Sequence, residues 1–197
     1  MTSPTAIQFG QDYHIYNRGN NLENIFREER NYEFFLNKYT QYVTPIAETY
    51  AYCLLKNHFH LMVRIKSLDE LDPTFQNNKP GQVFGNFFNA YVKAFNKLYQ
   101  RNGSLFQNPF GRVEVMSDRQ LFQLLIYIHQ NPERHGFVDD FRDWPHSSYT
   151  AITSDQPTWL KSDEVRDWFG GLKNLEVAHE TKVKEKQVQN LVPEEFD

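Results

Sequence analysis

Residues 48–65 read ETYAYCLLKNHFHLMVRI, and this stretch decides the fold of the chain. Two apolar runs, residues 48–55 and 58–65, are rich in aromatic and β-branched side chains and are separated only by Lys56 and Asn57. Runs of this kind with so short a connection predict two antiparallel strands joined as a tight hairpin.

The second run of the hairpin carries two histidines that can bind a metal ion. In a strand, successive side chains point to opposite faces, so His58 and His60 share one face while Phe59 points into the core. Two imidazoles side by side on a rigid strand can each turn a ring nitrogen toward one divalent cation. The alternative is an ordinary strand with two hydrogen-bonded core histidines, and the pair alone leaves both interpretations open.

Apolar periodicity predicts the other elements. Further strands are expected over residues 13–18 and 112–116, and helices over residues 28–43, 83–101 and from Ser117–Asp118 to Pro132. The resulting order is strand, helix, strand, strand, helix, strand and one more helix. This order predicts an α+β fold: a ferredoxin-like split βαβ domain with a four-stranded antiparallel sheet, helices on one face, and the other face free for a substrate.

The chain divides into three parts by composition. We expect a catalytic domain over residues 1–136, a C-terminal extension over 137–175 packed on it, and a charged, disordered tail over 176–197. Residues 1–136 carry 14 basic and 12 acidic side chains, and residues 137–197 carry 7 and 13, so the net charge of −4 comes from the C-terminal part. The overall acidity therefore does not argue against a nucleic-acid partner.

The remaining composition limits where the protein works. No run of about 18 apolar residues is present, which argues against a membrane span. The start of the chain, Met1 to Pro4, lacks the charged and apolar regions of a secretory signal. The single cysteine, Cys53, excludes an internal disulfide and an all-thiolate zinc site. We therefore expect a cytoplasmic protein.

The last predicted helix adds two residues with chemical potential. Tyr127 and Asn131 are four residues apart and so lie on one helical face. Two histidine nitrogens and one amide oxygen can hold Mg²⁺ or Mn²⁺ with positions open for a phosphate, beside which a tyrosine is a credible nucleophile. The alternatives are a buried tyrosine and an asparagine that ends a helix before a proline. His129, two residues from Tyr127, faces away, and neither it nor His14 nor His135 receives a role.

The chain resembles the REP-associated branch of the single-tyrosine HUH transposases over roughly residues 10–150. His58-Phe59-His60 fits the HUH motif, and Tyr127 with Asn131 one turn later resembles the nucleophile helix. The segments that carry the resemblance occur in the family's order and are residues 13–21, 51–61, 127–136 and 144–149.

The resemblance implies an activity, a substrate and a cofactor. Members act on single-stranded DNA that bears hairpins, formed by palindromic repeats, as monomers or homodimers. A divalent ion, Mg²⁺ or Mn²⁺, is expected on His58, His60 and Asn131. Tyr127 is expected to attack one phosphodiester, giving a 5′-phosphotyrosine and a free 3′-hydroxyl that can rejoin strands.

The chain departs from the family at two places, and several basic and amide side chains are candidates for DNA binding. Where relatives have a basic stretch, residues 105–112 keep only Arg112, and Asn131 stands where some members have glutamine. Basic side chains spaced by four along a helix can follow phosphates. The predicted DNA contacts are Asn17, Arg18, Asn20, Lys93, Lys97, Arg101 and Arg112.

Two other functions remain open. One is a domesticated, non-catalytic protein that binds hairpins of single-stranded DNA on the same fold, although such a protein has no need of Tyr127. The other is a metallohydrolase in which water is the nucleophile at the His58 and His60 site. The hydrolase would tolerate Tyr127→Phe, whereas the transposase would not.

Overall fold

The computed structural model describes residues 6–192. Residues 1–5 and 193–197 lie outside the described part, and so do the expectations placed on Met1 to Pro4 and on the last five residues of the tail. The strands are β1 (Asp12–Arg18), β2 (Ala47–Leu54), β3 (His58–Ile65) and β4 (Gly111–Glu114). The α-helices are α1 (Glu29–Tyr42), α2 (Pro80–Leu98), α3 (Asp118–Arg134), α4 (Tyr149–Thr153), α5 (Ser162–Trp168), α6 (Leu172–Glu180) and α7 (Glu185–Val188). Three short 3₁₀ helices are η1 (Asn20–Leu22), η2 (Leu68–Glu70) and η3 (Phe141–Asp143).

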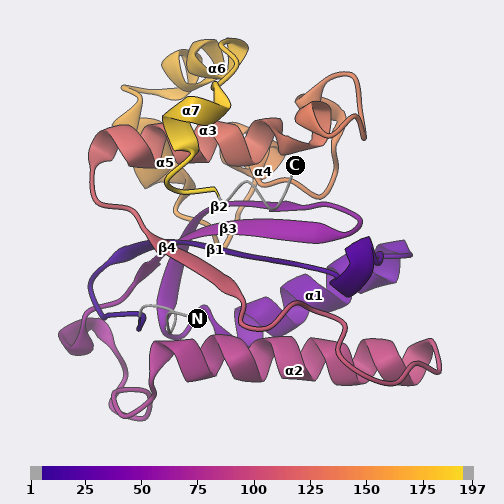
Figure 1. The fold of residues 1–197 in the computed structure, drawn as a ribbon. Coiled ribbons are helices and arrows are strands. Elements are labelled where there is room, and N and C mark those ends of the chain that lie inside the picture. The colour runs from indigo at the N-terminus through magenta and orange to yellow at the C-terminus, as the bar shows by residue number, and fades with distance from the viewer. Residues whose placement is uncertain (1–5, 193–197) are drawn as a thin grey trace.

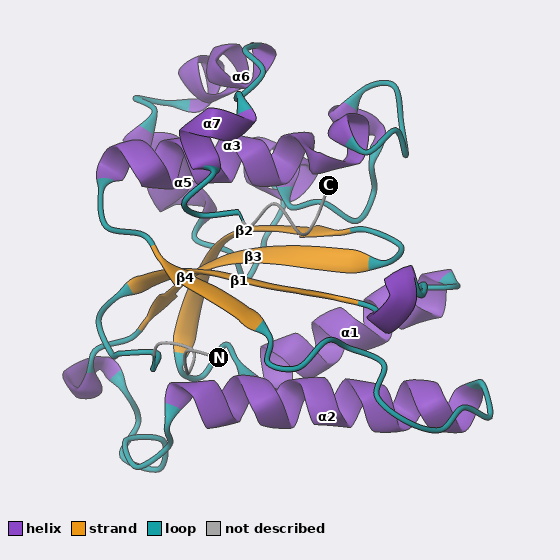
Figure 2. Ribbon diagram, viewed as in Figure 1, coloured by secondary structure: helices purple, strands orange, loops and turns teal. Residues whose placement is uncertain are grey.

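The four strands form one antiparallel sheet in the order β2-β3-β1-β4 (Figure 2). The chain runs β1-α1-β2-β3-α2-β4, so each helix carries it across the sheet between non-adjacent strands. This confirms the predicted ferredoxin-like arrangement. The hairpin of β2 and β3 also forms where residues 48–65 predict it, and β2 ends at Leu54.

Both faces of the sheet are covered by helices (Figure 1). α1 and α2 lie on one face, where Phe59 of β3 packs against Phe35 and Phe88. α3 lies on the other face, with α6 and α7 packed against it. The prediction of a free sheet face is therefore wrong. Its physical cause is that α3 is buried on all sides over residues 124–132, including the polar side chains of His129 and Asn131. A helix buried in this way lies between two layers of the fold.

Two helices differ from their predicted bounds because of prolines and a left-handed residue. α2 begins at Pro80, since a proline in the first turn needs no N–H donor. It ends at Leu98, and Gln100 takes a φ of 51°. α3 continues through Pro132 to Arg134, so this proline does not end the helix where the sequence predicts.

Residues 176–192 fold onto α3, unlike the disordered tail expected there. They contain the end of α6 and all of α7, and both helices contact α3. The apolar side chains of Val183, Val188 and Leu191 are buried. The sequence hides these anchors because they are spread over short helices and lack a sustained helical period. The three-part division of the chain remains a prediction.

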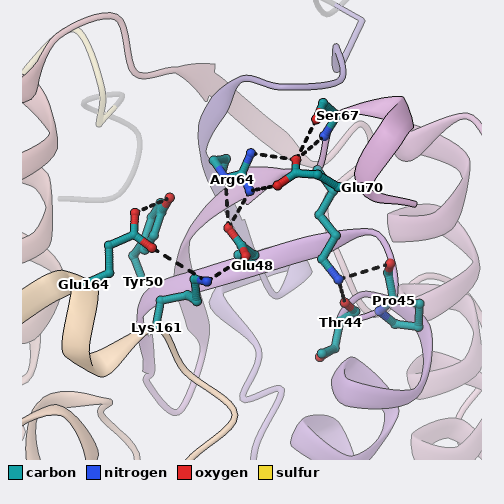
Figure 3. A network of polar contacts seen from close by, with 10 residues as sticks. Thr44, Pro45, Glu48, Tyr50, Arg64, Ser67, Glu70, Lys161 and Glu164 are labelled. Carbon is teal, nitrogen blue, oxygen red and sulfur yellow. Dashed lines mark hydrogen bonds and ion pairs between the residues drawn. The ribbon is translucent and has the colours of Figure 1, made fainter. Parts of the chain in front are cut away.

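A polar network fastens α5 to the far end of the sheet from the two histidines (Figure 3). Arg64 of β3 forms ion pairs with Glu48 of β2 and with Glu70 of η2. Lys161, which precedes α5, pairs with the same Glu48 at 2.8 Å. Glu164 of α5 lies 3.4 Å from the Tyr50 hydroxyl, which donates to it. The chain after α3 is thus held to β2 and β3 by charge as well as by apolar packing.

No helix in residues 6–192 is both long enough and apolar enough to pass through a membrane.

Candidate active site

His58 and His60 lie on the sheet face that α3 covers. Across the sheet His58 pairs with Arg18 and His60 pairs with Tyr16, so these four side chains share that face. The two rings meet edge to face, with centroids 5.2 Å apart. His58 is only 4% exposed and His60 is fully buried. The two imidazoles are held side by side, away from bulk water.

A hydrogen-bonded relay fixes the tautomer of His60. The backbone oxygen of Leu191 lies 2.7 Å from His14 Nδ1 and can only accept, so that nitrogen carries the proton. Burial lowers the pKa of His14 to about 4 and holds that of His60 well below its usual range, so both rings are neutral. His60 Nδ1 therefore donates to His14 Nε2, 2.9 Å away. The lone pair of His60 is left on Nε2.

His58 is set in the same tautomer by its neighbour in the chain. Its Nδ1 lies 2.8 Å from Asn57 Oδ1, an acceptor, so Nδ1 donates and Nε2 carries the lone pair. Burial lowers the pKa of His58 to about 3, and the charges of His135 and Arg18 act in the same direction. A neutral imidazole whose Nδ1 proton is engaged is the form in which histidine binds a metal through Nε2.

Asn131 faces the two histidines from α3. It lies one turn after Tyr127 and one turn before His135, on one helical stripe. The ring of Tyr127 meets His60 with centroids 6.1 Å apart, and that of His135 meets His58 at 4.9 Å. The residue between them is therefore opposite the pair.

The amide of Asn131 has an acceptor to spare. Its Nδ2 donates to the backbone oxygen of Tyr127 at 2.9 Å. Its Oδ1 is buried and has no hydrogen-bond partner among residues 6–192. A buried acceptor that has no hydrogen bond destabilises the fold by about 1–3 kcal/mol. Such an atom in a fully buried side chain calls for an explanation, and a missing ligand is one.

Tyr127 is almost completely enclosed. Its side chain is 1% exposed, and the Arg134 guanidinium lies 4.9 Å from its ring centroid. Arg134 donates through Nη1 to the backbone oxygen of Val183 at 2.8 Å. The carbonyl of Leu191 is bound to His14 in the same way. Residues 183–192 thus cover the site, and Figure 1 shows their helix α7 beside α3.

The donor set of two imidazole nitrogens and one amide oxygen fits a divalent metal ion. Within the described chain no three histidine, cysteine, aspartate or glutamate side chains gather into a metal site. A metal ion bound through Nε2 of His58 and of His60 would need at least one more ligand from the protein, and Asn131 Oδ1 can be that ligand. Three neutral donors leave the charge of the ion uncompensated, which suits a site that also takes an anionic phosphate.

The amide residues predicted to bind DNA have structural partners, while Arg18 lies at the site. Arg18 shares the face of His58. Asn17 points to the opposite face, is 3% exposed, and donates to the Gln107 backbone oxygen at 3.2 Å. Asn20 donates to the Phe106 backbone oxygen at 3.0 Å and so braces the turn after β1. These hydrogen bonds shape the backbone here, and DNA binding by Asn17 and Asn20 stays a prediction.

The predicted basic stripe on α2 is shorter than expected. Arg101 lies beyond the end of the helix, where it forms an ion pair with Glu23. Lys93 and Lys97 are exposed on α2, on the far side of the sheet from the histidines. Arg112 is half-buried on β4 and points toward the first turn of α2, because a Cβ on Gly81 would lie 3.4 Å from its guanidinium.

The sequence gives no role to three residues that structure the site. They are His14, His135 and Arg134, which contact His60, His58 and Tyr127. Alternation along β1 places His14 on the face of Tyr16 and Arg18, but only the register of β1 against β3 shows that this face carries the histidines. His129 does face away, and it is bound to His179 and Ser148.

Comparison with known proteins supports the family resemblance. No protein-family profile matches the chain. A curated Haemophilus influenzae protein named a putative REP-associated tyrosine transposase is 30% identical over 112 residues. The aligned part is 52% of this chain and 58% of that protein, so the chain spans little more than half of its relative. The resemblance drawn from the motifs is thereby confirmed.

A solved structure shows the same fold. It is described as a REP-associated tyrosine transposase bound to a REP hairpin, and it matches with a TM-score of 0.58. The match covers 80% of this chain and 88% of that one at 16% identity, a level at which the likeness concerns the fold alone.

Proposed function

We propose that the protein is a metal-dependent strand transferase of the tyrosine transposase type, which cleaves and rejoins single-stranded DNA that bears a hairpin. The observation that carries the proposal is the buried Oδ1 of Asn131, which has no hydrogen-bond partner among residues 6–192. Asn131 lies on the stripe of α3 between Tyr127 and His135, whose rings contact His60 and His58. The relative is named a putative REP-associated tyrosine transposase and the solved structure is described as bound to a REP hairpin, which supports a transposase that acts on hairpin DNA.

His58 and His60 through Nε2, and Asn131 through Oδ1, are the residues that would hold Mg²⁺ or Mn²⁺. When bound, such an ion polarises a phosphodiester and offsets the negative charge that develops on it. The hydrogen bonds from His60 to His14 and from His58 to Asn57 keep both Nε2 atoms directed and deprotonated before any ion arrives.

Tyr127 is the proposed nucleophile. Its Oη forms a new bond to the phosphorus and loses its phenol proton, while the bond from phosphorus to the 3′ oxygen breaks and that oxygen leaves as a 3′-hydroxyl. One phosphate ester replaces another, so no nucleotide cofactor is consumed. The guanidinium of Arg134 lies 4.9 Å from the centroid of the Tyr127 ring, and Arg18 shares the face of His58, so both would place positive charge near the phosphate.

The site must open before DNA can reach it. Tyr127 and Asn131 are at most 1% exposed, and residues 183–192 lie over them through bonds to Arg134 and His14. Displacing that segment costs the two backbone-carbonyl bonds and the burial of Val188 and Leu191. Turnover is therefore expected to depend on how firmly this segment is held.

The burial of Tyr127 also favours a second candidate function, a hairpin-binding protein without turnover. This protein would keep the fold and bind DNA outside the covered site. A third, a hydrolase that uses water, remains open because the two histidines could serve it equally. The three candidates differ in whether a covalent bond to protein forms and whether Tyr127 is needed.

The decisive experiment incubates the protein with hairpins in single-stranded DNA and Mg²⁺ or Mn²⁺ and separates the products on a denaturing gel. Strand transfer predicts a protein–DNA adduct with the wild type and none with Tyr127→Phe. Binding without any adduct, across a library of hairpins, supports the non-catalytic candidate. Cleavage that persists in Tyr127→Phe supports the hydrolase and removes Tyr127 as nucleophile.

One chain can supply the whole proposed set, because His58, His60 and Tyr127 are in ring contact within one copy and Asn131 lies one turn after Tyr127 on α3. A monomer is therefore sufficient for the chemistry, although a homodimer that shares tyrosines remains compatible with the family resemblance. We propose a cytoplasmic protein, since its DNA substrate lies there.

A further inference from the structure

A cavity of about 580 Å³ lies between α1 and α2, on the side of the sheet away from the two histidines (Figure 1). Its volume is within the range of small-molecule sites in proteins. Its walls are apolar and come from both helices: Phe34 of α1, and Tyr91, Ala94, Phe95 and Leu98 of α2. Leu98 is 44% exposed, so apolar surface is open to solvent here. A ligand with an apolar body gains free energy by covering it.

Asn31 gives the cavity one hydrogen-bond donor. Its side chain is only 4% exposed, and it is one of the lining residues. Its Oδ1 accepts from the backbone N–H groups of Arg27 at 2.9 Å and Glu28 at 3.1 Å, and from the Tyr99 hydroxyl at 2.9 Å. These three donors fix which end of the amide is the oxygen. Nδ2 points away from them and donates to no acceptor within residues 6–192, so it is available to an acceptor in the cavity.

Two cationic side chains stand at the rim of the cavity. Arg30 and Lys97 are exposed and line it from α1 and α2. Arg30 forms an ion pair with Glu28 at 3.0 Å, and Glu28 does not line the cavity. Lys97 forms no ion pair with any residue of the described chain. No acidic side chain is among the lining residues of the described part, so the cavity favours an anion.

The charges at the rim also limit the charge of the ligand. The charge of Arg30 is already balanced by Glu28, so Lys97 is left to balance about one negative charge. A carboxylate carries one, and it accepts hydrogen bonds from both an ammonium and an amide N–H.

We propose that this cavity binds a free amphipathic carboxylate, with its apolar body between α1 and α2 and its carboxylate at Lys97 and Asn31. The inference goes beyond the proposed function and does not depend on it, because the cavity lies across the sheet from the candidate active site and shares none of its residues.

The test compares three probes that share one apolar body and differ in charge: octanoate, 1-octanol and octylamine. Their dissociation constants and stoichiometries are measured by isothermal titration calorimetry on the full chain, without DNA or metal. Lys97→Gln removes the charge at the rim. Lys93→Gln is the matched control, since it makes the same change one turn earlier on α2, at an exposed position that does not line the cavity.

We expect one equivalent of octanoate to bind the wild type about tenfold or more tighter than 1-octanol does. Lys97→Gln should bring the two dissociation constants within about threefold of each other, and Lys93→Gln should behave like the wild type. Asn31→Asp keeps the oxygen that caps α1 and adds a negative charge, so this variant should lose octanoate and bind octylamine instead.

Three results overturn the inference. One is equal binding of octanoate and 1-octanol by the wild type, or uptake of octanoate without saturation. Another is an equal loss of octanoate binding in Lys97→Gln and Lys93→Gln. The third is a protein that sediments as a dimer, binds no octanoate and is dissociated by Leu98→Glu, because a second copy then fills the cavity. The adduct experiment with DNA tests the proposed function separately, since no probe here reports on it.

Discussion

Replacing His14 by phenylalanine separates the support of the metal site from the stability of the fold. Phenylalanine keeps a flat ring stacked on His60 but removes both hydrogen bonds of the relay. The His60 Nδ1 proton and the Leu191 carbonyl are left unpaired in a buried place, at about 1–3 kcal/mol each, or about 2–6 kcal/mol in all. Loss of the group that orients a metal-binding histidine lowers metal affinity about 10- to 100-fold.

The assay pairs urea unfolding with a titration of Mn²⁺ followed by electron paramagnetic resonance, which needs no DNA. His129→Phe is the matched control, because His129 is also fully buried with two hydrogen bonds but lies on the other side of α3. We expect both variants to lose stability and only His14→Phe to lose Mn²⁺ affinity. Wild-type affinity in a folded His14→Phe protein would refute the role of the relay.

Three further predictions follow from buried groups. Burial lowers the pKa of His179 to about 4, whereas a histidine in the unfolded chain has a pKa near 6.5. Between these pH values the unfolded state binds one more proton than the folded state, so the free energy of unfolding falls as the pH drops from 6.5 to 4. Between pH 7 and pH 4.5 the free energy of unfolding of His179→Gln should fall by about 2 kcal/mol less than that of the wild type. An equal fall in both proteins contradicts this prediction. Asn131→Leu removes the acceptor without a partner together with one hydrogen bond, so we expect the free energy of unfolding to change by less than about 1 kcal/mol. Binding of Mn²⁺ should become at least about tenfold weaker. Unchanged Mn²⁺ binding excludes Asn131 as a ligand. Leu191→Asp puts a charge in a buried position and should therefore release residues 183–192 from the site. We expect the yield of the protein–DNA adduct on gels to rise several-fold. A lower yield from a folded variant argues against a covering role for this segment.

Periodicity in the sequence predicts the order of the elements and the ferredoxin-like sheet, because one face of each helix is apolar in a regular pattern. The hairpin around Asn57 and the N-cap at Ser117 were predictable from local chemistry, since both depend on residues within a few positions. Strand order followed from the sequence of elements alone. The sequence did not predict that α3 covers the second face of the sheet, because this depends on which elements α3 contacts in the folded protein.

The candidate site was predictable only in part, for a related reason. Spacing along one element places His58 with His60 and Tyr127 with Asn131. Contact between elements depends on strand register, and that is why the role of His14 could not be predicted from the sequence. The same limit applies to Arg101, whose spacing fits a helix that has already ended.

The most direct test of the central claim is to identify the atom to which the DNA becomes attached. The wild type is incubated with a hairpin-bearing strand and Mn²⁺, digested with protease and nuclease, and the peptides are analysed by mass spectrometry. The account predicts a nucleotide joined through its 5′ phosphate to the peptide that contains Tyr127, and no such peptide in Tyr127→Phe. Attachment at another tyrosine, or cleaved DNA without any attached peptide, would contradict it.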